Sequence, residues 1–249
     1  MQAVILAGGL GTRLKPITET IPKPMVPVAG VPYLVHQLRL LAKQGINDVV
    51  LLTGYLGEQI EQYFGDGSSL GLKIRYSQEK EPLGTAGALR NAANLLAPDF
   101  LLIYGDSYLP IHYPDVLNLL RAGGHTGVIV LYDNSIDDTS VRNNIATDEN
   151  LIVTVYEKNS PRNDLKYVDA GVLAFQRPVL DFIPSSLKRV SLEEEIFPQL
   201  IAQRQMAGYV TTQRFYDIGT PERLEKIEAF IADDHHENPI SNQLRRRRD

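Results

Sequence analysis

Cysteine, tryptophan and long hydrophobic runs are all missing from the 249-residue chain. Without cysteine, neither disulfide bonds nor cysteine-ligated metals can stabilise the fold, so any metal must bind to oxygen or histidine. No apolar run approaches the roughly 20 residues of a membrane-spanning helix, and the N-terminal MQAVILAGG has no cationic leader. These absences predict a soluble protein of the reducing cytoplasm, with no membrane partner.

Acidic residues outnumber basic residues in this chain, with 30 Asp and Glu against 25 Lys and Arg. The formal net charge is −5, which argues against a nucleic-acid partner. The one basic run, Arg245 to Arg248, follows a polar stretch, and we interpret residues 234–249 as a disordered polar and basic tail. The five histidines are scattered and no pair has the spacing of metal ligands.

Strand-like and helix-like segments alternate through the first half of the chain. The apolar, β-branched runs cover 2–7, 48–53, 72–77, 100–105 and 127–132, and the segments of helical period cover 32–45, 56–65, 84–96 and 113–124. This alternation predicts right-handed βαβ crossovers and a mostly parallel sheet flanked by helices. The later strand-like runs cover 151–158, 166–175 and 207–213, and the later helix-like runs cover 191–203 and 221–233. We therefore predict an α/β, Rossmann-like fold with a mixed sheet: one globule over 1–233, with halves 1–133 and 134–233.

A glycine-rich turn, LAGGLGTRLKP at residues 6–16, directly follows the first strand-like run. A P-loop needs Gly-Lys followed by Ser or Thr, whereas Gly11 is followed by Thr12 and Arg13. A dinucleotide fingerprint needs a third glycine where Leu14 stands, and no acidic residue ends the second strand-like run. The turn is therefore neither motif, and a redox Rossmann enzyme is disfavoured.

The same turn concentrates cations in a chain that is negatively charged. At the carboxyl end of a strand, where open α/β sheets bind ligands, its glycines allow backbone amides to approach an anion. Arg13 adds a planar fork for phosphate oxygens, and Lys15 and Lys23 add point charges. A solvated basic turn is the alternative interpretation, but this concentration of cations favours a phosphate-bearing ligand.

The longer stretch LAGGLGTRLKPITETIPKPMVPVAGVP, residues 6–32, resembles the signature of the sugar-1-phosphate nucleotidyltransferases, also called nucleoside-diphosphate-sugar pyrophosphorylases. The resemblance implies that the loop wraps an NTP, that Arg13 contacts its phosphates, and that Lys23 bridges the reacting phosphates. It also implies the reaction, in which a sugar 1-phosphate attacks the α-phosphorus and pyrophosphate leaves. The halves 1–133 and 134–233 then become the nucleotide-binding and sugar-binding halves of one nucleotidyltransferase domain.

Two isolated aspartates meet the need of such a reaction for a divalent cation. Asp106, in LLIYGDSYL, ends an apolar run, where a core role would leave a buried charge unpaired. Asp217, in RFYDIGTPERL, precedes a helix-like run, and its alternative role is a turn or helix cap. Both resemble the family's metal-binding aspartates, so we predict Mg²⁺ at Asp106 and Asp217.

Three further stretches resemble motifs of the same family. EPLGTAGAL, residues 81–89, resembles its base-recognition loop, and Gln78 lies just upstream. Glu157-Lys158 resembles the motif that binds sugar hydroxyls and the sugar phosphate, although Asn159 replaces its proline. YVDAGVLAF resembles the motif that lines the sugar pocket, with Asp169 where asparagine is frequent; this acid is a candidate mark of a different sugar.

The resemblance assigns residues to three roles. The predicted nucleotide-binding residues are Leu6, Ala7, Gly8, Gly9, Gly11, Thr12, Arg13, Gln78, Pro82, Leu83, Gly84, Thr85 and Gly105. The predicted sugar-phosphate-binding residues are Lys23, Glu157, Lys158, Asp169 and Gly171. The predicted catalytic residues are Arg13, Lys23, Asp106 and Asp217.

The acidic run Glu193-Glu194-Glu195 allows two interpretations. It resembles a set of metal ligands, but Ser191 followed three residues later by Glu194 is a capping box. Acidic residues also stabilise a helix N-terminus, so we interpret the run as a helix start.

Two motifs narrow the substrates. PLGTAGAL and DIGTPERL most resemble guanylyltransferases acting on mannose or heptose 1-phosphates, ahead of uridylyl, cytidylyl and thymidylyl relatives. A catalytically silent homologue that senses NDP-sugars, or an enzyme with a non-sugar acceptor, is the alternative. We expect no appended β-helix after the last helix-like run, and a homodimer is the default expectation.

Overall fold

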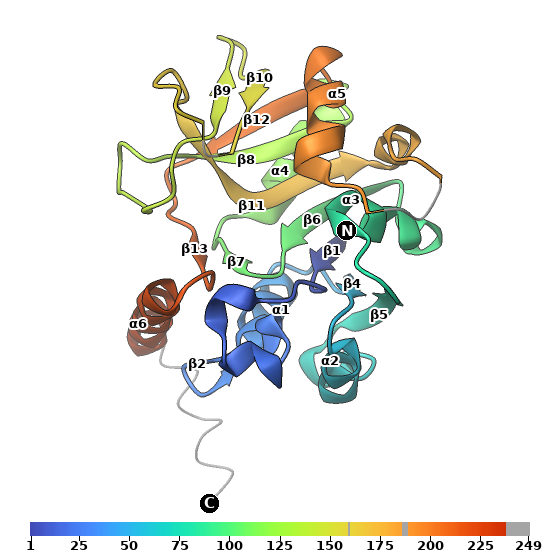
Figure 1. The fold of residues 1–249 in the computed structure, drawn as a ribbon, viewed down its shortest axis with the longest axis vertical. Helices are drawn as coiled ribbons and strands as arrows, with labels where there is room; N and C mark the ends of the chain where they lie inside the picture. Colours follow the sequence, from blue (N-terminus) through green and yellow to red (C-terminus); the bar gives the residue numbers. More distant parts are fainter. Residues whose placement is uncertain (159, 186–188, 238–249) are drawn as a thin grey trace, which may run out of the picture.

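The computed structural model describes residues 1–158, 160–185 and 189–237, with the backbone alone for 234–237 (Figure 1). Its main sheet contains β1 (Gln2–Leu6), β4 (Asp48–Thr53), β5 (Lys73–Gln78), β6 (Asp99–Tyr104), β8 (Gly127–Asp133), β9 (Ile145–Thr147), β10 (Val153–Tyr156), β11 (Tyr167–Gln176) and β12 (Met206–Thr211). Two short ladders lie outside it: β2 (Pro27–Val28) with β3 (Val31–Pro32), and β7 (Ser107–Tyr108) with β13 (Tyr216–Asp217).

Helices follow most of the strands. The α-helices are α1 (Tyr33–Lys43), α2 (Gly57–Phe64), α3 (Gly84–Asn91), α4 (Tyr113–Gly123), α5 (Phe197–Ala202) and α6 (Pro221–Glu237). A π-helical turn, Leu192–Ile196, leads directly into α5. Short 3₁₀ turns cover Thr12–Leu14, Ile17–Glu19, Lys23–Met25, Ser68–Leu70, Ala93–Leu95 and Arg177–Phe182.

The first half builds a parallel sheet in the order β5-β4-β1-β6. Its strands are nearly continuous apolar runs because both faces of the sheet are covered. Side chains on β1 alternate between the faces: Ala3 and Ile5 belong to one buried cluster, and Val4 belongs to the other. The carboxyl ends of β1, β4 and β6 consequently meet at one edge, which is where a parallel sheet binds ligands.

The second half extends this sheet with mixed pairing. Strand β11 runs antiparallel to both β6 and β8, and β12 pairs parallel with β8. Strand β11 carries a bulge, because Asp169 pairs with Leu131 whereas Leu173 pairs with Ile129. Two extra residues of β11 therefore bend out of the ladder with β8 between these pairs.

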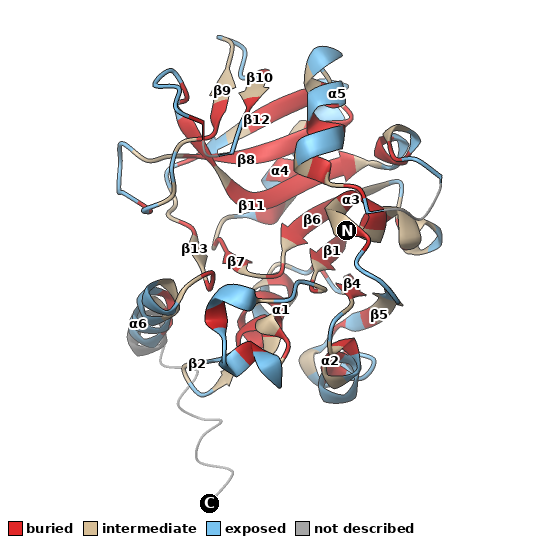
Figure 2. Ribbon diagram, viewed as in Figure 1, coloured by how far each residue is buried: buried red, intermediate tan, exposed pale blue. Residues whose placement is uncertain are grey.

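Helices cover both faces of the sheet. Helices α1, α2 and α4 contribute buried residues to the cluster on one face, and α3 and α5 contribute to the cluster on the other. Figure 2 shows the strands buried between helices whose outer sides are exposed. A third, smaller cluster lies where α6 packs on the β7–β13 ladder, and its buried members are Val28, Tyr33, Tyr108, Ile218, Ile227 and Ile231.

The structure extends the sequence prediction at several places. Helix α6 continues to Glu237, past the predicted end at 233, and the remainder of the predicted tail, 238–249, lies outside the described residues. The ladder of β7 with β13 and the short strand β9 were not predicted. Among the described residues, no helix combines the length and apolar character that a membrane span requires.

Candidate active site

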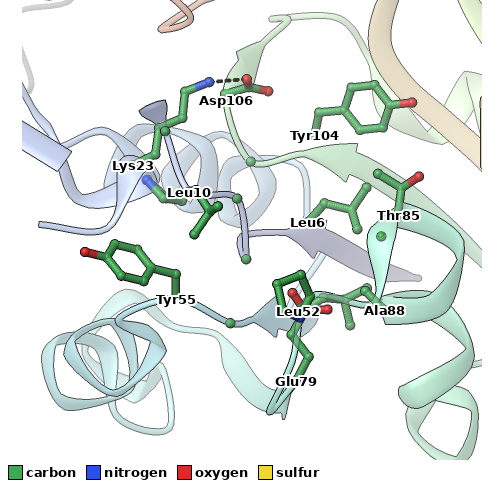
Figure 3. A pocket seen from close by; sticks show the side chains of 18 of the residues that line it. Leu6, Leu10, Lys23, Leu52, Tyr55, Glu79, Thr85, Ala88, Tyr104 and Asp106 are labelled. Carbon is green, nitrogen blue, oxygen red and sulfur yellow. Dashed lines mark hydrogen bonds and ion pairs between the residues drawn. The ribbon is translucent and has the colours of Figure 1, made fainter. Parts of the chain in front are cut away.

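A cavity of about 1230 Å³ opens at the carboxyl ends of β1, β4 and β6 (Figure 3). Fourteen predicted site residues line it: Leu6, Gly8, Gly9, Gly11, Thr12, Arg13, Lys23, Gln78, Pro82, Gly84, Thr85, Gly105, Asp106 and Lys158. The other predicted site residues, Ala7, Leu83, Glu157, Asp169, Gly171 and Asp217, do not line it. The structure thus gathers most of the predicted site residues, from both halves of the chain, around one space.

The glycine turn folds back onto its own continuation. Gly11 has a φ of +62°, and a Cβ there would lie 2.9 Å from Thr18 Cγ2 and 3.0 Å from Lys23 Cβ. The Thr18 hydroxyl donates to the Gly11 carbonyl at 2.8 Å. Because only glycine adopts this conformation and allows this contact without strain, the turn brings Lys23 next to itself.

Asp106 reaches the same place through Gly105. The Gly105 amide donates to the Leu6 carbonyl at 3.0 Å, and a Cβ on Gly105 would collide with that carbonyl. The contact joins the ends of β1 and β6, so Asp106 lies beside the glycine turn. There its carboxylate pairs with Lys23, with 2.5 Å between Nζ and Oδ2, and Figure 3 shows the pair.

Asp217 approaches Asp106 through the short ladder. It pairs with Ser107 across β7 and β13, and the amide of Ile218 donates to the Asp106 carbonyl at 3.1 Å. The Asp217 carboxylate accepts from the Gly219 amide at 2.7 Å and from Arg223 Nη1 at 3.1 and 3.3 Å. Each predicted metal ligand is therefore paired with a cation of the chain.

Two carboxylates fit a magnesium ion that takes its other ligands from phosphates and water. Their side chains are 33% exposed for Asp106 and 13% exposed for Asp217. Within the described ranges, no group of three or more His, Cys, Asp or Glu residues could hold a metal by itself. The donor set is consistent with an ion that arrives with a phosphate ligand.

Arg13 completes this side of the cavity. A Cβ on Gly219 would lie 3.3 Å from Arg13 Nη2 and 2.6 Å from Asp217 Oδ1. The glycine therefore provides the space in which the guanidinium of Arg13 and the carboxylate of Asp217 come close together. Sequence reasoning missed Gly219, although its place two residues after Asp217 was a signal.

The second glycine turn packs against the segment before α5. Gly84 has a φ of +72°, and its α-carbon approaches the Val190 backbone so closely that a Cβ would lie 3.0 Å from the carbonyl carbon. The Val190 amide donates to the Leu83 carbonyl at 2.8 Å, which explains why Leu83 is buried.

Glu79 is a cavity residue that sequence reasoning missed in favour of its neighbour Gln78. Its Oε2 accepts from the Leu83 amide at 3.0 Å, and its Oε1 lies near the backbone of Gly8 and Gly54. Burial raises the pKa of Glu79, and the Leu83 amide partly offsets this rise. Gln78 is exposed, whereas Glu79 is half-buried. The available signal was the place of Glu79 directly after β5, at the carboxyl end of a parallel strand, where such sheets bind ligands.

Glu193 is the second missed residue, and it lies where the two halves of the site meet. One carboxylate oxygen accepts from Thr85 Oγ1 at 2.8 Å and Ser191 Oγ at 2.9 Å. The other accepts from Tyr104 Oη at 3.0 Å and Lys158 Nζ at 3.1 Å. These four donors use the whole acceptor capacity of the carboxylate, so Glu193 holds other side chains in place.

The ionisation of Glu193 follows from these partners. Burial opposes its charge, but the ammonium of Lys158, the backbone and the two hydroxyls of Thr85 and Ser191 outweigh burial and lower its pKa to about 2. The predicted cap is also present: Ser191 Oγ accepts from the Glu194 amide at 3.2 Å. The reciprocal acceptor is Glu195, which accepts from the Ser191 amide at 2.9 Å, because the first turn is π-helical.

The predicted sugar-binding residues separate in the structure. Glu157 accepts from Ser160 Oγ at 2.7 Å and from Arg162 Nη1 at 3.4 Å, so its carboxylate is engaged outside the cavity. Asp169 accepts from Tyr156 Oη at 3.0 Å and from the Gly171 amide at 2.9 Å. Burial raises the pKa of Asp169 to about 6, against the effect of these two donors.

Gly171 explains how the β11 bulge fits. Its φ is +76°, and a Cβ would collide with the side chain of Ser107. The bulge therefore packs directly on β7, which joins the sugar-side strand to the ladder that carries Asp217. The sugar-binding roles of Glu157, Asp169 and Gly171 stay predictions.

Comparison with known proteins agrees with this geometry. A family model described as nucleotidyl transferase matches residues 2–234. The chain belongs to the nucleotidyl transferase family. The predicted family and the predicted α/β fold are thus confirmed.

Several relatives share most of this chain. The mannose-1-phosphate guanylyltransferase of Mycobacterium tuberculosis is 37% identical over 235 residues, which cover 93% of this chain and 65% of that protein. The mannose-1-phosphate guanyltransferase of Saccharomyces cerevisiae is 33% identical over 231 residues, covering 89% and 62%. The chain therefore spans less than two thirds of the length of both relatives. Among solved structures, HddC from Yersinia pseudotuberculosis complexed with GMP-PN has a TM-score of 0.74 and 29% identity, covering 90% of this chain and 96% of that one.

Proposed function

We propose that this chain transfers a guanylyl group from GTP to a mannose- or heptose-type sugar 1-phosphate, with Mg²⁺ as cofactor. The observation that carries the proposal is the composition of the cavity, in which two glycine turns meet the cations Arg13, Lys23 and Lys158. These cations, with Lys80 and Arg189 also in the lining, are suited to two polyanionic substrates that must react with each other. The guanylyl preference is further supported by the names of the relatives.

The chemistry requires little covalent help from the protein. An oxygen of the sugar phosphate forms a bond to the α-phosphorus of the nucleotide, and the bond from that phosphorus to the leaving pyrophosphate breaks. Arg13 and Lys23 neutralise the triphosphate, and Lys158 holds the incoming phosphate. No general base is required, because a phosphate monoester is already an anion near neutral pH. Asp106 and Asp217 would hold the divalent ion, whose charge stabilises the phosphate oxygens.

Glu79 supports guanine as the base. Guanine presents two adjacent donors, N1–H and N2–H, whereas adenine, uracil and thymine present no such pair. Glu79 Oε1 accepts no hydrogen bond from the described residues, and Glu79 lines the cavity. Figure 3 places Glu79 with the apolar side chains of Leu52 and Ala88, away from Lys23, where a base would lie while its phosphates reach the cations.

The direct test measures pyrophosphate release with Mg²⁺ for GTP, UTP, CTP, ATP and dTTP against mannose, glucose, N-acetylglucosamine and heptose 1-phosphates. We expect release with GTP and one acceptor of the mannose or heptose type. Release with another nucleotide alone would replace the guanylyl assignment but keep the reaction. Silence in all combinations, with NDP-sugars still raising the melting temperature, would favour the sensing homologue.

The base assignment has its own test in Glu79→Gln. We expect kcat/KM to fall by roughly 10- to 100-fold for GTP, the usual effect of losing a hydrogen bond to a charged group. The fall should be much smaller for ITP, because inosine lacks the 2-amino group and has already lost one of the two hydrogen bonds. The matched control is Glu58→Gln in α2, which should change kcat/KM for neither nucleotide because Glu58 is exposed and does not line the cavity. An equal loss for GTP and ITP would mean that Glu79 only positions the Leu83 turn.

A further inference from the structure

A buried hydroxyl without a hydrogen-bond partner lies in the third cluster, beside the β7–β13 ladder. Tyr33, the first residue of α1, is 0% exposed, and its Oη has no partner. Within the described part of the chain, only Gln37 Oε1 and Arg75 Nε share this condition. A buried hydroxyl that forms no hydrogen bond destabilises the protein that carries it, so its presence needs an explanation. Phenylalanine would fill the same volume without that cost.

The place of Tyr33 connects it with the predicted metal ligands. It belongs to the third buried cluster, together with Tyr108 and Ile218. Tyr108 is in β7 directly after the Asp106 segment, and Ile218 directly follows Asp217. Tyr33 therefore packs against the ladder that brings the two carboxylates together.

The charges of both carboxylates reach the phenol. Burial first, and then the charges of Asp106 and Asp217, raise the pKa of Tyr33 well above its ordinary value. The hydroxyl consequently stays protonated at neutral pH and can only act there as a neutral donor or acceptor. Two carboxylates nearby make donation the favoured role.

Asp106 is paired with Lys23, which in the proposed reaction neutralises the triphosphate. In this structure Lys23 is the side chain that donates to Asp106, and the ammonium is largely buried, with 12% of the lysine side chain exposed. A divalent ion on Asp106 would compete with the ammonium of Lys23. The substrate phosphates would attract the same ammonium away from Asp106. Once Lys23 leaves, one carboxylate oxygen of Asp106 can bind the ion, and the carboxylate needs another donor to fix its orientation.

We propose that Tyr33 is a positioning residue for the metal-binding carboxylates, whose hydroxyl donates to Asp106, directly or through one water, after Lys23 has left it. The inference rests on the proposed function, because it requires a divalent ion at Asp106 and Asp217. Hydrogen bonds from outside the ligand set orient metal-binding side chains, and their loss typically weakens metal binding by 10- to 100-fold. A hydroxyl that is unpaired in the metal-free protein becomes paired when the metal binds.

The test is Tyr33→Phe in the full chain, with Mn²⁺ as the probe, GTP present and no sugar 1-phosphate, and the protein-bound Mn²⁺ measured by electron paramagnetic resonance. We expect the variant to bind Mn²⁺ about tenfold more weakly, at the lower end of the range for such partners. We also expect the metal-free variant to melt about 2–4 °C higher, because an unpaired buried hydroxyl has been removed. A purely structural role would not give opposite effects on stability and on metal binding.

The matched control is Tyr113→Phe. Tyr113 is also buried, but its hydroxyl donates to the Leu109 carbonyl at 2.9 Å. Removing that hydroxyl should lower the melting temperature and leave Mn²⁺ binding unchanged.

Three outcomes would overturn the inference, and they are distinguishable. Equal Mn²⁺ affinity in wild type and Tyr33→Phe would show that the hydroxyl is not used, and would leave the proposed function intact. A lower melting temperature of the metal-free variant would show that the hydroxyl is already paired before the metal binds. A wild-type protein that neither binds Mn²⁺ nor releases pyrophosphate would remove the proposed function and the inference together.

Discussion

Glu193 should contribute a pH-dependent part of the stability. Its side chain is 9% exposed, and its carboxylate joins α3, β6 and the segment after β10 through Thr85, Tyr104 and Lys158. The perturbation is Glu193→Gln, which keeps the size of the side chain and removes its charge. The partners of Glu193 in the folded protein favour its ionised carboxylate. Removing the charge should therefore destabilise the folded protein.

The magnitude follows from the pKa. The pKa of Glu193 falls from an ordinary 4.5 to about 2 on folding, and one unit corresponds to about 1.36 kcal/mol. The ionised carboxylate then contributes about 3 kcal/mol at pH 7. Since the pKa is lowered, the contribution is complete above pH 4.5 and is lost as the pH falls toward 2. At pH 4, about 1 kcal/mol of it should already be gone.

The assay is urea unfolding followed by circular dichroism at pH 7 and pH 4. The difference in unfolding free energy between wild type and Glu193→Gln should be about 3 kcal/mol at pH 7 and smaller by about 1 kcal/mol at pH 4. The matched control is Glu194→Gln, because Glu194 is the exposed neighbour in the same acidic run. A difference for Glu193→Gln that stays the same at both pH values, or that grows at pH 4, would refute the reasoning.

Two further predictions concern the reacting centre. Asp106→Asn and Asp217→Asn should each leave the melting temperature near the wild-type value. Each should reduce pyrophosphate release by orders of magnitude, because it removes an anionic ligand from the metal. Wild-type rates in both variants would show that the metal assignment is wrong. Gly219→Ala should reduce release by at least tenfold, because its Cβ would lie 2.6 Å from Asp217 Oδ1 and 3.3 Å from Arg13 Nη2. Gly123→Ala in α4 is the matched control, since Gly123 is exposed, does not line the cavity, and its Cβ would first meet the side chain of His125. Equal rates in both alanine variants would mean that Asp217 and Arg13 can move aside.

The sheet was predictable because its signals are local and strong. Buried parallel strands are continuous apolar runs, so β1, β4 and β6 were visible from composition alone. The β7–β13 ladder was not, because each of its strands contributes only two residues. So short a strand has no periodicity, and its pairing depends on packing under α6.

The site residues also differ in whether a local sequence signal marks them. Residues of the glycine turns were predictable, since their conformations require glycine in a fixed order. Glu193 was hidden because it is one of three identical acids, and only the π-helical turn directs it into the cavity. Glu157 stands next to Lys158 in the sequence, but its pairing with Ser160 and Arg162 depends on a surface loop that no motif describes.

The β7–β13 ladder joins two predicted metal ligands that lie far apart in the sequence. Asp106 follows a central strand of the first half, whereas Asp217 is fixed only when β13 docks on β7 and α6 covers it. During synthesis on the ribosome, the glycine turn and Asp106 emerge long before Asp217. If the assignment of the ligands is right, catalysis would be the last property that the protein acquires.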